Sequence, residues 1–331
     1  MRREGSPWQG LGVVFRKEFN DHLRSPRMIV LELLVVLIPI AALFAALRAL
    51  ADNASDLATV SQIQQPMLYL RSLTVAREPL LSFVAFLGFL VPLMGIGLAF
   101  DSVNGEHSRR TLSRILAQPI YRDALLFGKF LAGLATLAVC LTALWLMVTG
   151  LTIWKLGFPP SAEEIARSLV FLIITIFYAG VWLALAMLFS IVFRSAATAA
   201  LAALGTWLFL ALLWPALVPA IAIAIAPADP QSAALGLGNP AVVEWQDALA
   251  RLSPNTLYKE AFVPLLNPSM QIPSLLDISQ LLELRSAVRG ALLPLGQSLM
   301  LIWPQAVSLI GSTIVLFAAG YVLFQRQEVR A

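Results

Sequence analysis

Side chains that could carry out chemistry are scarce in this chain, and they are not grouped as catalytic or metal sites require. Only 13% of the 331 residues are charged, whereas 59% are hydrophobic. The two histidines, His22 and His107, have no ligand spacing between them, and the single cysteine, Cys140, lies in an apolar stretch. No carboxylate pair is spaced for acid–base catalysis, and the sequence has no phosphate-binding glycine loop. The sequence therefore predicts a non-enzymatic chain without a catalytic residue, metal or cofactor of its own.

The charged residues that do gather lie between Glu106 and Lys129. Apolar residues at helical spacing, Leu112, Ile115 and Leu116, predict one face of a short helix. The opposite face is polar and basic, with Arg109, Arg110, Ser113 and Arg114. A proline ends this helix, and a second helix begins before Lys129 and continues into an apolar stretch. A charged amphipathic segment between two spans predicts a surface for a cytoplasmic partner.

Six apolar stretches must position this segment. Each meets the length of roughly 17–25 residues that a membrane-spanning helix needs. They cover approximately residues 29–50, 80–101, 130–154, 168–193, 196–226 and 298–324. The fifth is too long for one simple span, and Pro215 and Pro219 predict a break or a kink near its outer end, or a partly re-entrant helix. The predicted fold class is an all-α polytopic membrane protein with six transmembrane helices.

An amphipathic helix over residues 10–25 is predicted before the first span. Its apolar face recurs every four residues, at Leu11, Phe15, Phe19 and Leu23. Such a helix suits the headgroup layer of a bilayer, and Ser25-Pro26 should end it. It acts either as a topological anchor alone or also as a contact for a cytoplasmic partner. Within the first span, Glu32 is expected to be an interfacial carboxylate paired with Arg24, Arg27 or a lipid headgroup.

Basic residues predict the orientation. With a cytoplasmic N-terminus, 14 of the 23 lysines and arginines fall on the inner side, in shorter connections than the other nine. This asymmetry predicts a bacterial inner-membrane protein with both termini in the cytoplasm. A pI near 9.5 does not indicate nucleic-acid binding here, because no basic patch is interleaved with aromatic residues.

The segment that ends at Lys129 resembles permease subunits of ABC transporters of the type-2 family, in particular the NosY-like branch. Members carry an acidic residue followed by Gly-Thr-Leu, then Leu, Pro, Arg and a closing Gly-Lys. The matching positions are Glu106, Thr111, Leu112, Leu116, Pro119, Arg122, Gly128 and Lys129, with Arg110 at the position of the usual glycine. The stretch 251–261 resembles the Ser-Pro motif of their outer loop, and 321–330 resembles their last span with its cationic exit.

The resemblance implies that energy comes from two copies of a separate cytoplasmic ATPase, which would hold ATP and magnesium, and that the permease works as a homodimer. It implies an ATPase coupling interface within a cytoplasmic coupling segment, residues 102–129. That interface would comprise Glu106, Arg110, Thr111, Leu112, Ile115, Leu116, Pro119, Arg122, Gly128 and Lys129. The function implied is coupling of ATP hydrolysis to substrate export or translocation. The alternative is a membrane anchor that transmits force to a periplasmic partner without passing substrate.

A loop of about seventy residues, 227–297, is predicted outside the membrane between the fifth and sixth spans. Val242, Trp245, Leu249 and Leu252 share one helical face, and apolar spacing around residues 278–292 suggests a second amphipathic helix. The loop is either a surface-lying spacer or a cap that docks a periplasmic or lipid-linked partner.

Overall fold

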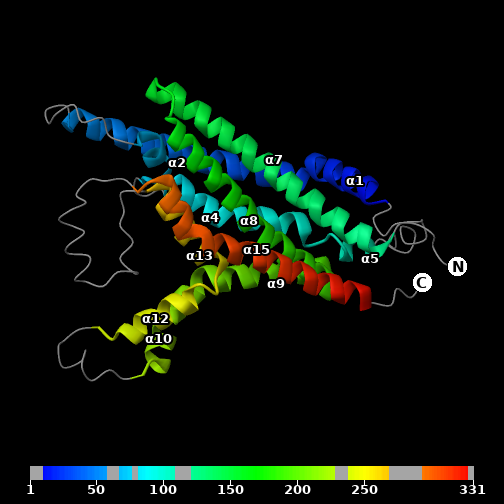
Figure 1. Ribbon diagram of the computed structural model, residues 1–331. Coiled ribbons are helices and arrows are strands. Elements are labelled where there is room, and N and C mark those ends of the chain that lie inside the picture. The colour runs from blue at the N-terminus through cyan, green and yellow to red at the C-terminus, as the bar shows by residue number, and fades with distance from the viewer. Residues whose placement is uncertain are drawn as a thin grey trace.

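The computed structural model describes residues 10–57, 67–76, 81–108, 121–227, 238–267 and 293–326, with side chains for all of these but 51–57 and 107–108. Within these ranges the chain is helical and has no strand (Figure 1). The helices are α1 (Leu11–Arg24), α2 (Pro26–Leu57), α3 (Leu68–Thr74), α4 (Phe83–Ala99), α5 (Asn104–Ser108), α7 (Arg122–Leu156), α8 (Ala162–Val192), α9 (Ala196–Leu208), α10 (Trp214–Ile225), α12 (Pro240–Ala250), α13 (Pro254–Leu266) and α15 (Leu295–Arg326).

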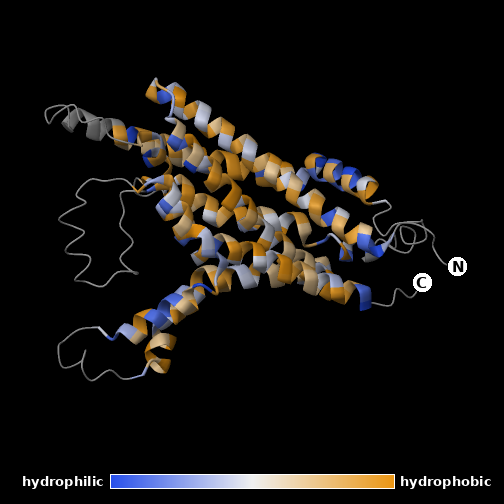
Figure 2. Cartoon of the chain, in the orientation of Figure 1, coloured by the Kyte–Doolittle hydropathy of each residue, from blue (hydrophilic) through white to orange (hydrophobic). Residues whose placement is uncertain are grey.

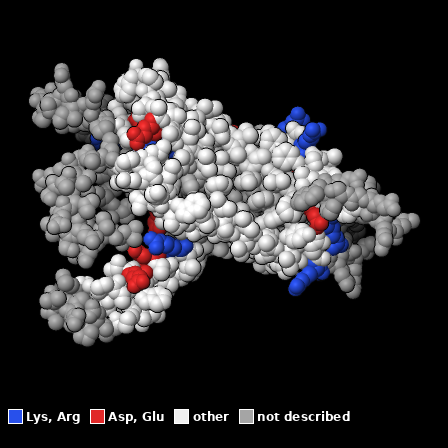
Figure 3. All heavy atoms as spheres, in the orientation of Figure 1, with Lys and Arg blue, Asp and Glu red and all other residues white. Residues whose placement is uncertain are grey.

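Six helical segments are long and apolar enough to cross a membrane, which confirms the predicted fold class. They are Pro26–Leu50, Phe83–Glu106, Arg122–Leu156, Ala162–Val192, Ala196–Ile225 and Leu295–Arg326. Their middle parts form an apolar belt (Figure 2), and on the face shown in Figure 3 the described charged side chains gather toward the two ends. A belt of this kind matches the hydrocarbon core of a bilayer, where charged side chains are costly.

Helix α8 lies at the centre of the bundle and packs against α4, α7, α13 and α15. It begins with a capping box at Ser161 and Glu164, and Trp182 in its middle is fully buried. Gly95 of α4 permits the closest approach, because a Cβ there would lie 2.9 Å from the carbonyl oxygen of Ala179 and 3.0 Å from the amide nitrogen of Leu183. Small residues bring membrane helices together in this way, so α4 and α8 form a tightly packed pair.

The predicted break in the fifth span is a π-helical turn, η1 (Phe209–Leu213), between α9 and α10. Pro215 follows it and has no N–H for the regular helical hydrogen bond, which explains why the ladder changes here. Ser253 Oγ donates to the carbonyl oxygen of Leu210 within this turn at 2.9 Å. Beyond η1, α10 packs against α12, and the pair leaves the main bundle (Figure 1).

Helix α13 lies inside the bundle, although its sequence falls in the predicted outer loop. Tyr258 is 1% exposed and stacks on Tyr178 of α8, with ring centroids 4.4 Å apart. Tyr178 Oη donates to the carbonyl oxygen of Gly88 in α4 at 2.9 Å. The Ser-Pro motif therefore starts a helix that packs into the core, and a surface-lying spacer is wrong for this part of the loop. The predicted helix around Trp245 is present as α12, whereas the one expected near residues 278–292 lies outside the described residues.

Helix α1, α5 and the last residues of α15 lie at the same end of the bundle, here named the α1 end (Figure 1). The start of α8 and the C-terminal end of α13 lie at the other end, here named the α13 end (Figure 1). As predicted, α1 ends at Ser25, whose backbone is extended, and α2 begins at Pro26.

Candidate functional site

Lys129 joins three elements at the α1 end. Its side chain projects from α7 and is only 4% exposed. The Nζ atom lies 3.0 Å from Glu18 Oε1 of α1 and 2.8 Å from Glu106 Oε1 of α5. Removing an ammonium group from water is costly, and the two carboxylates offset that cost. We call Glu18, Lys129 and Glu106 the Lys129 junction; it ties α1, α5 and α7 together.

Gly128 explains why α1 can reach this position. A Cβ on Gly128 would lie 2.8 Å from Val14 Cγ1 and 2.9 Å from Val14 Cβ, and 3.4 Å from the carbonyl oxygen of Leu11. Only glycine leaves room for α1 to lie directly on α7 at this distance. Gly128 thus leaves room for α1, and the adjacent Lys129 pairs with the Glu18 carboxylate of that helix.

The face of α1 that packs on the bundle differs from the face that the four-residue apolar repeat suggested. Val14 is 6% exposed and Glu18 is largely buried, so both face α7. Phe15 and Phe19 stack on one another with ring centroids 5.8 Å apart and stay half-buried, and Leu23 is 38% exposed. The aromatic stripe therefore borders the packed face and remains available to a surrounding bilayer.

The junction sets the charge states of two residues of α1. Burial alone would raise the pKa of the Glu18 carboxyl, but the ammonium groups of Lys129 and Lys17 outweigh it and lower that pKa below its ordinary value. Burial holds the pKa of His22 below its ordinary value, against the attraction of carboxylates such as Glu18 and Asp101. At neutral pH, Glu18 is therefore ionised and His22 is neutral.

Two further polar contacts connect the α1 end to other spans. Arg27, at the start of α2, forms an ion pair with Asp101, which follows α4. Arg27, one of the three partners expected for Glu32, is therefore paired with another carboxylate. Asp123, in the first turn of α7, accepts a hydrogen bond from Tyr321 Oη at 2.9 Å and another from the Gln325 amide of α15. The start of α7 is thus fixed to α1, α5 and α15.

Four residues of the predicted coupling interface are described. Glu106, Gly128 and Lys129 come together at the Lys129 junction, and Arg122 is the first residue of α7. The other six, Arg110, Thr111, Leu112, Ile115, Leu116 and Pro119, lie outside the described residues. Sequence reasoning missed Glu18. A signal existed, because Glu18 is an acidic residue four positions after Val14, within the apolar side of an amphipathic helix.

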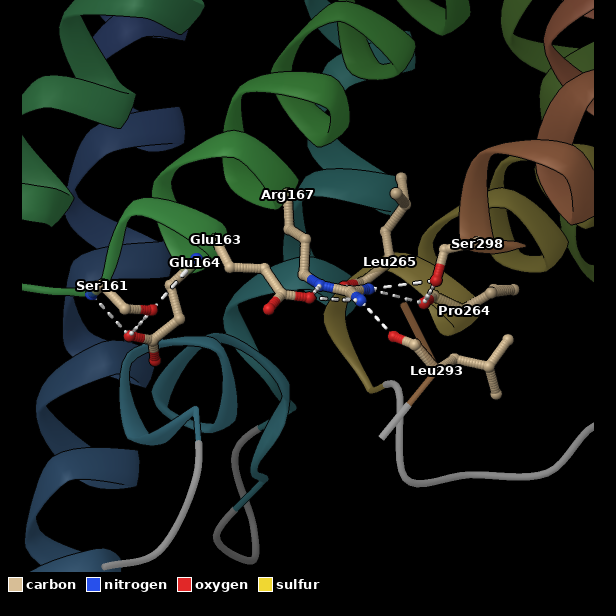
Figure 4. A network of polar contacts seen from close by, with 8 residues as sticks. All are labelled: Ser161, Glu163, Glu164, Arg167, Pro264, Leu265, Leu293 and Ser298. Atoms are coloured by element: carbon tan, nitrogen blue, oxygen red, sulfur yellow. Dashed lines mark hydrogen bonds and ion pairs between the residues drawn. The ribbon is translucent and has the colours of Figure 1, made fainter. Parts of the chain in front are cut away.

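A second buried cation, Arg167, organises the α13 end (Figure 4). Its side chain is fully buried, and its Nη2 lies 2.8 Å from Glu163 Oε1. Its Nη1 donates to the carbonyl oxygens of Pro264 and Leu265 at 3.3 and 3.2 Å, and to Ser298 Oγ at 3.0 Å. These contacts, here named the Arg167 clamp, join the start of α8 to the end of α13 and the start of α15. Sequence reasoning missed this role of Arg167, because its acceptors lie about 100 or more positions further along the chain, apart from Glu163.

Glu164, beside the clamp, has a separate role. Its carboxylate accepts from the backbone N–H of Ser161 at 2.8 Å and from the backbone N–H of Tyr69 at 2.9 Å. It therefore caps α8 and also satisfies a free donor at the start of α3. In the described parts of the chain, no group of three or more histidine, cysteine, aspartate or glutamate side chains could hold a metal ion.

Six spans, of which α8 is the most buried, with charged junctions at their ends, define an α-helical multi-pass membrane protein. The sequence profile of the ABC-2 family transporter proteins matches residues 13–329, so the chain belongs to this family of ABC transporter permeases. Among curated proteins it is similar to a protein named "Probable ABC transporter permease protein NosY" from Stutzerimonas stutzeri, at 26% identity over 256 residues. A protein of the same name from Pseudomonas aeruginosa is 29% identical over 252 residues. Each match covers 74% of this chain and 78% of the relative.

Proposed function

We propose that this permease couples ATP hydrolysis by a separate ATPase subunit to substrate export, as a homodimer with two ATPase copies that hold ATP and magnesium. The observation that carries the proposal is the contact between Glu106 and Lys129, 2.8 Å apart. These residues bracket the predicted coupling helix. Because its two ends are tied together, a push on the helix reaches the spans on both sides of it at once.

The surrounding contacts support a path for such a movement. A movement of α7 is transmitted to α1 through the Lys129–Glu18 ion pair, and to α15 through the hydrogen bond between Asp123 and Tyr321. Each link is a side-chain contact between different helices, so a tilt of α7 displaces both neighbours. The path starts at the segment that we propose binds the ATPase.

The coupling helix is tested by a matched pair of substitutions. Leu112→Asp lies on its predicted apolar face and Ser113→Asp on its polar face. We expect Leu112→Asp to reduce recovery of the ATPase complex and substrate-linked ATPase activity, since burial of a leucine is worth roughly 1.5–3 kcal/mol. Ser113→Asp should leave both near the unsubstituted level. Equal, mild effects at both positions would refute the coupling helix and favour a solvated loop.

A separate experiment tests whether ATP hydrolysis belongs to a second subunit. The purified chain alone should not bind ATP, and ATPase activity should appear only when a second subunit is added. Specific ATP binding by the isolated permease would overturn the proposal. If ATPase activity appears in the complex but no substrate crosses the membrane in vesicles, the chain acts as a force-transmitting anchor and not as a permease.

The proposed location is a bacterial inner membrane, with the α1 end and both termini in the cytoplasm. In a Cys140→Ala background, single cysteines at Ser108 and Arg326 should react with an impermeant reagent only from the cytoplasmic side. A cysteine at Ser269 should react only from the outside. Labelling of position 108 from the outside would reverse the orientation. A periplasmic or lipid-linked partner, if present, would bind in the 227–297 region and should be captured by crosslinking from Ser269→Cys.

A further inference from the structure

A cleft of about 770 Å³ opens beside the Lys129 junction, between α1, the start of α2, the end of α4 and α5. This volume lies within the range of sites that hold small molecules or lipid headgroups, roughly 300–1,000 Å³. The cleft lies where the span Pro26–Leu50 begins and the span Phe83–Glu106 ends. It therefore opens at the depth of the lipid headgroups, whichever side of the membrane this end faces.

Ion pairs line the cleft. Lys17 lies 2.9 Å from Glu18 and 3.3 Å from Asp21, and Arg27 pairs with Asp101. The side chains of Lys17, Asp21 and Arg27 are 57–63% exposed, and that of Asp101 is 25% exposed. Ion pairs with exposed partners contribute little stability, so a ligand can exchange with these partners at low cost. A ligand that carries both a cation and an anion matches this wall.

The balance of charge in the cleft disfavours a purely anionic ligand. Its wall includes the ammonium and guanidinium groups of Lys17, Arg27 and Lys129. It also includes the carboxylates of Glu18, Asp21, Asp101 and Glu106, so carboxylates outnumber cations in the wall by one. Because His22 is neutral at neutral pH, it does not change this balance. A ligand with an ammonium group in addition to its anion is favoured.

Part of the cleft wall is apolar and includes Met28, Leu31 and Leu98. The side of α2 that faces away from the bundle exposes a row of large apolar side chains. They are Ile29, Val30, Leu33, Leu34 and Leu37, each 44–58% exposed. This row begins two residues after Arg27 on the outward face of α2, and it suits the acyl chains of a lipid whose headgroup contacts Arg27.

One polar group of the wall has no partner in the described part of the chain. The Ser102 hydroxyl is buried there without a hydrogen bond. A buried hydroxyl left unpaired costs about 1–3 kcal/mol, so a ligand oxygen that accepts its proton would recover that energy. A phosphate or ester oxygen is an acceptor of this kind.

We propose that this cleft binds a zwitterionic phospholipid with a primary ammonium group, of the phosphatidylethanolamine class. The phosphate pairs with Lys17 and Arg27, the ammonium with Asp21 and Asp101, and the acyl chains follow the exposed face of α2. The bound headgroup bridges α1 to α2 and α4, and so holds the interfacial helix against the spans. The site does not depend on ATPase coupling.

Native mass spectrometry of the full chain, loaded with equal amounts of three lipids that share their acyl chains, tests the site. Phosphatidylethanolamine and phosphatidylcholine differ only in the methyl groups on nitrogen, and phosphatidylglycerol lacks the ammonium. We expect phosphatidylethanolamine to be retained about tenfold more than either, because only its ammonium group donates charge-assisted N–H hydrogen bonds to the carboxylates. Equal retention of phosphatidylethanolamine and phosphatidylcholine, preference for phosphatidylglycerol, or no retained lipid would each overturn the proposal.

Matched variants locate the site. Asp21→Asn should reduce the preference for phosphatidylethanolamine at least about threefold, since it removes a partner of the ammonium group. Lys17→Gln should reduce retention of all three lipids at least about threefold, since it removes a partner of the phosphate that they share. Asp247→Asn in α12 and the exposed Lys259→Gln in α13 make the same chemical changes away from the cleft and should have no effect. An unchanged preference in Asp21→Asn together with unchanged retention in Lys17→Gln would place the lipid elsewhere and refute this assignment.

Discussion

Two buried cations hold opposite ends of this permease, and they are held by different kinds of oxygen. Lys129 contacts two carboxylates, from α1 and α5. Arg167 contacts one carboxylate, the carbonyl oxygens of α13 and of Leu293, and the Ser298 hydroxyl. An ammonium ion attracts carboxylates from many directions, whereas a planar guanidinium fixes the direction of each bond. The Lys129 junction can therefore adjust as helices shift, while the Arg167 clamp defines one geometry.

The comparison also separates what each site joins. The Lys129 junction connects α1 and the short helix α5 to α7, at the end where the ATPase is proposed to bind. The Arg167 clamp connects a side chain of α8 to main-chain carbonyls of α13 and of Leu293 and to the Ser298 side chain of α15, and it fixes α13 inside the bundle. The difference indicates a mobile contact at the α1 end and a rigid one at the α13 end.

The largest effect is expected for Arg167→Met, which breaks the clamp. The Leu265 carbonyl, the Ser298 hydroxyl and the Glu163 carboxylate lose the guanidinium, although Pro264 still accepts from Ser298 Oγ. Removal of one partner from a buried charged network costs about 3–5 kcal/mol. Denaturant unfolding in mild detergent should report this loss. Arg251→Met is the control, because Arg251 forms a partly exposed pair with Glu260 and should contribute less than about 1 kcal/mol. Equal losses for both variants would contradict a special role for the clamp.

Reciprocal exchange of the two cations sharpens the comparison. Arg167→Lys should cost roughly 2–3 kcal/mol, because one ammonium cannot reach all the acceptors of the guanidinium. Lys129→Arg should cost less than about 1 kcal/mol, since the charge remains and the adjoining cleft has room for the larger head. The same unfolding measurement applies to both. A larger loss at Lys129 than at Arg167 would reverse the distinction drawn between directional and adjustable contacts.

Gly128→Ala should weaken the packing of α1 on α7 by about 1–3 kcal/mol, because the new methyl group overlaps Val14. Spin labels at Asn20 in α1 and Val139 in α7 should report a longer or broader distance distribution. Gly150→Ala in the same helix is the control, since nothing lies within 4 Å of the added carbon. Combining Gly128→Ala with Val14→Ala should restore part of the original distance. An unaltered distance in Gly128→Ala would show that the close approach is not required.

The smallest effect is expected from acidification of the Lys129 junction. The pKa of Glu18 is lowered in the folded protein, so its contribution is fully present above its ordinary value of 4.5. That contribution is lost as pH falls from there through the lower folded value. The spin-label distance between α1 and α7 should lengthen over this range. A Glu18→Gln chain should have lost the contribution at every pH and should show no such transition, whereas identical transitions in both chains would assign it to another group.

The membrane-spanning helices were predicted well from the sequence, and the contacts between these helices were predicted less well. Long apolar runs predicted six spans whose ends agree with the structure to within about five residues, apart from the starts of the third and fourth, because hydrocarbon-spanning helices need both length and continuous hydrophobicity. The third span begins at Arg122 rather than near residue 130, since the helix expected before Lys129 continues into it without a break. Ser25-Pro26 correctly marked the end of α1.

Tertiary structure alone decided which of the scattered polar residues meet. Lys129 and Glu18 are 111 positions apart, and Arg167 and Ser298 are 131 apart, so no local period relates them. The burial of α13 was equally hidden, because its prolines and charged flanks look like a loop until Tyr258 is seen stacked on Tyr178. Hydrophobic length and periodicity act along the chain and can be read from it. Buried charge pairs and glycine contacts depend on the rotation and depth of neighbouring helices, which only their mutual packing determines.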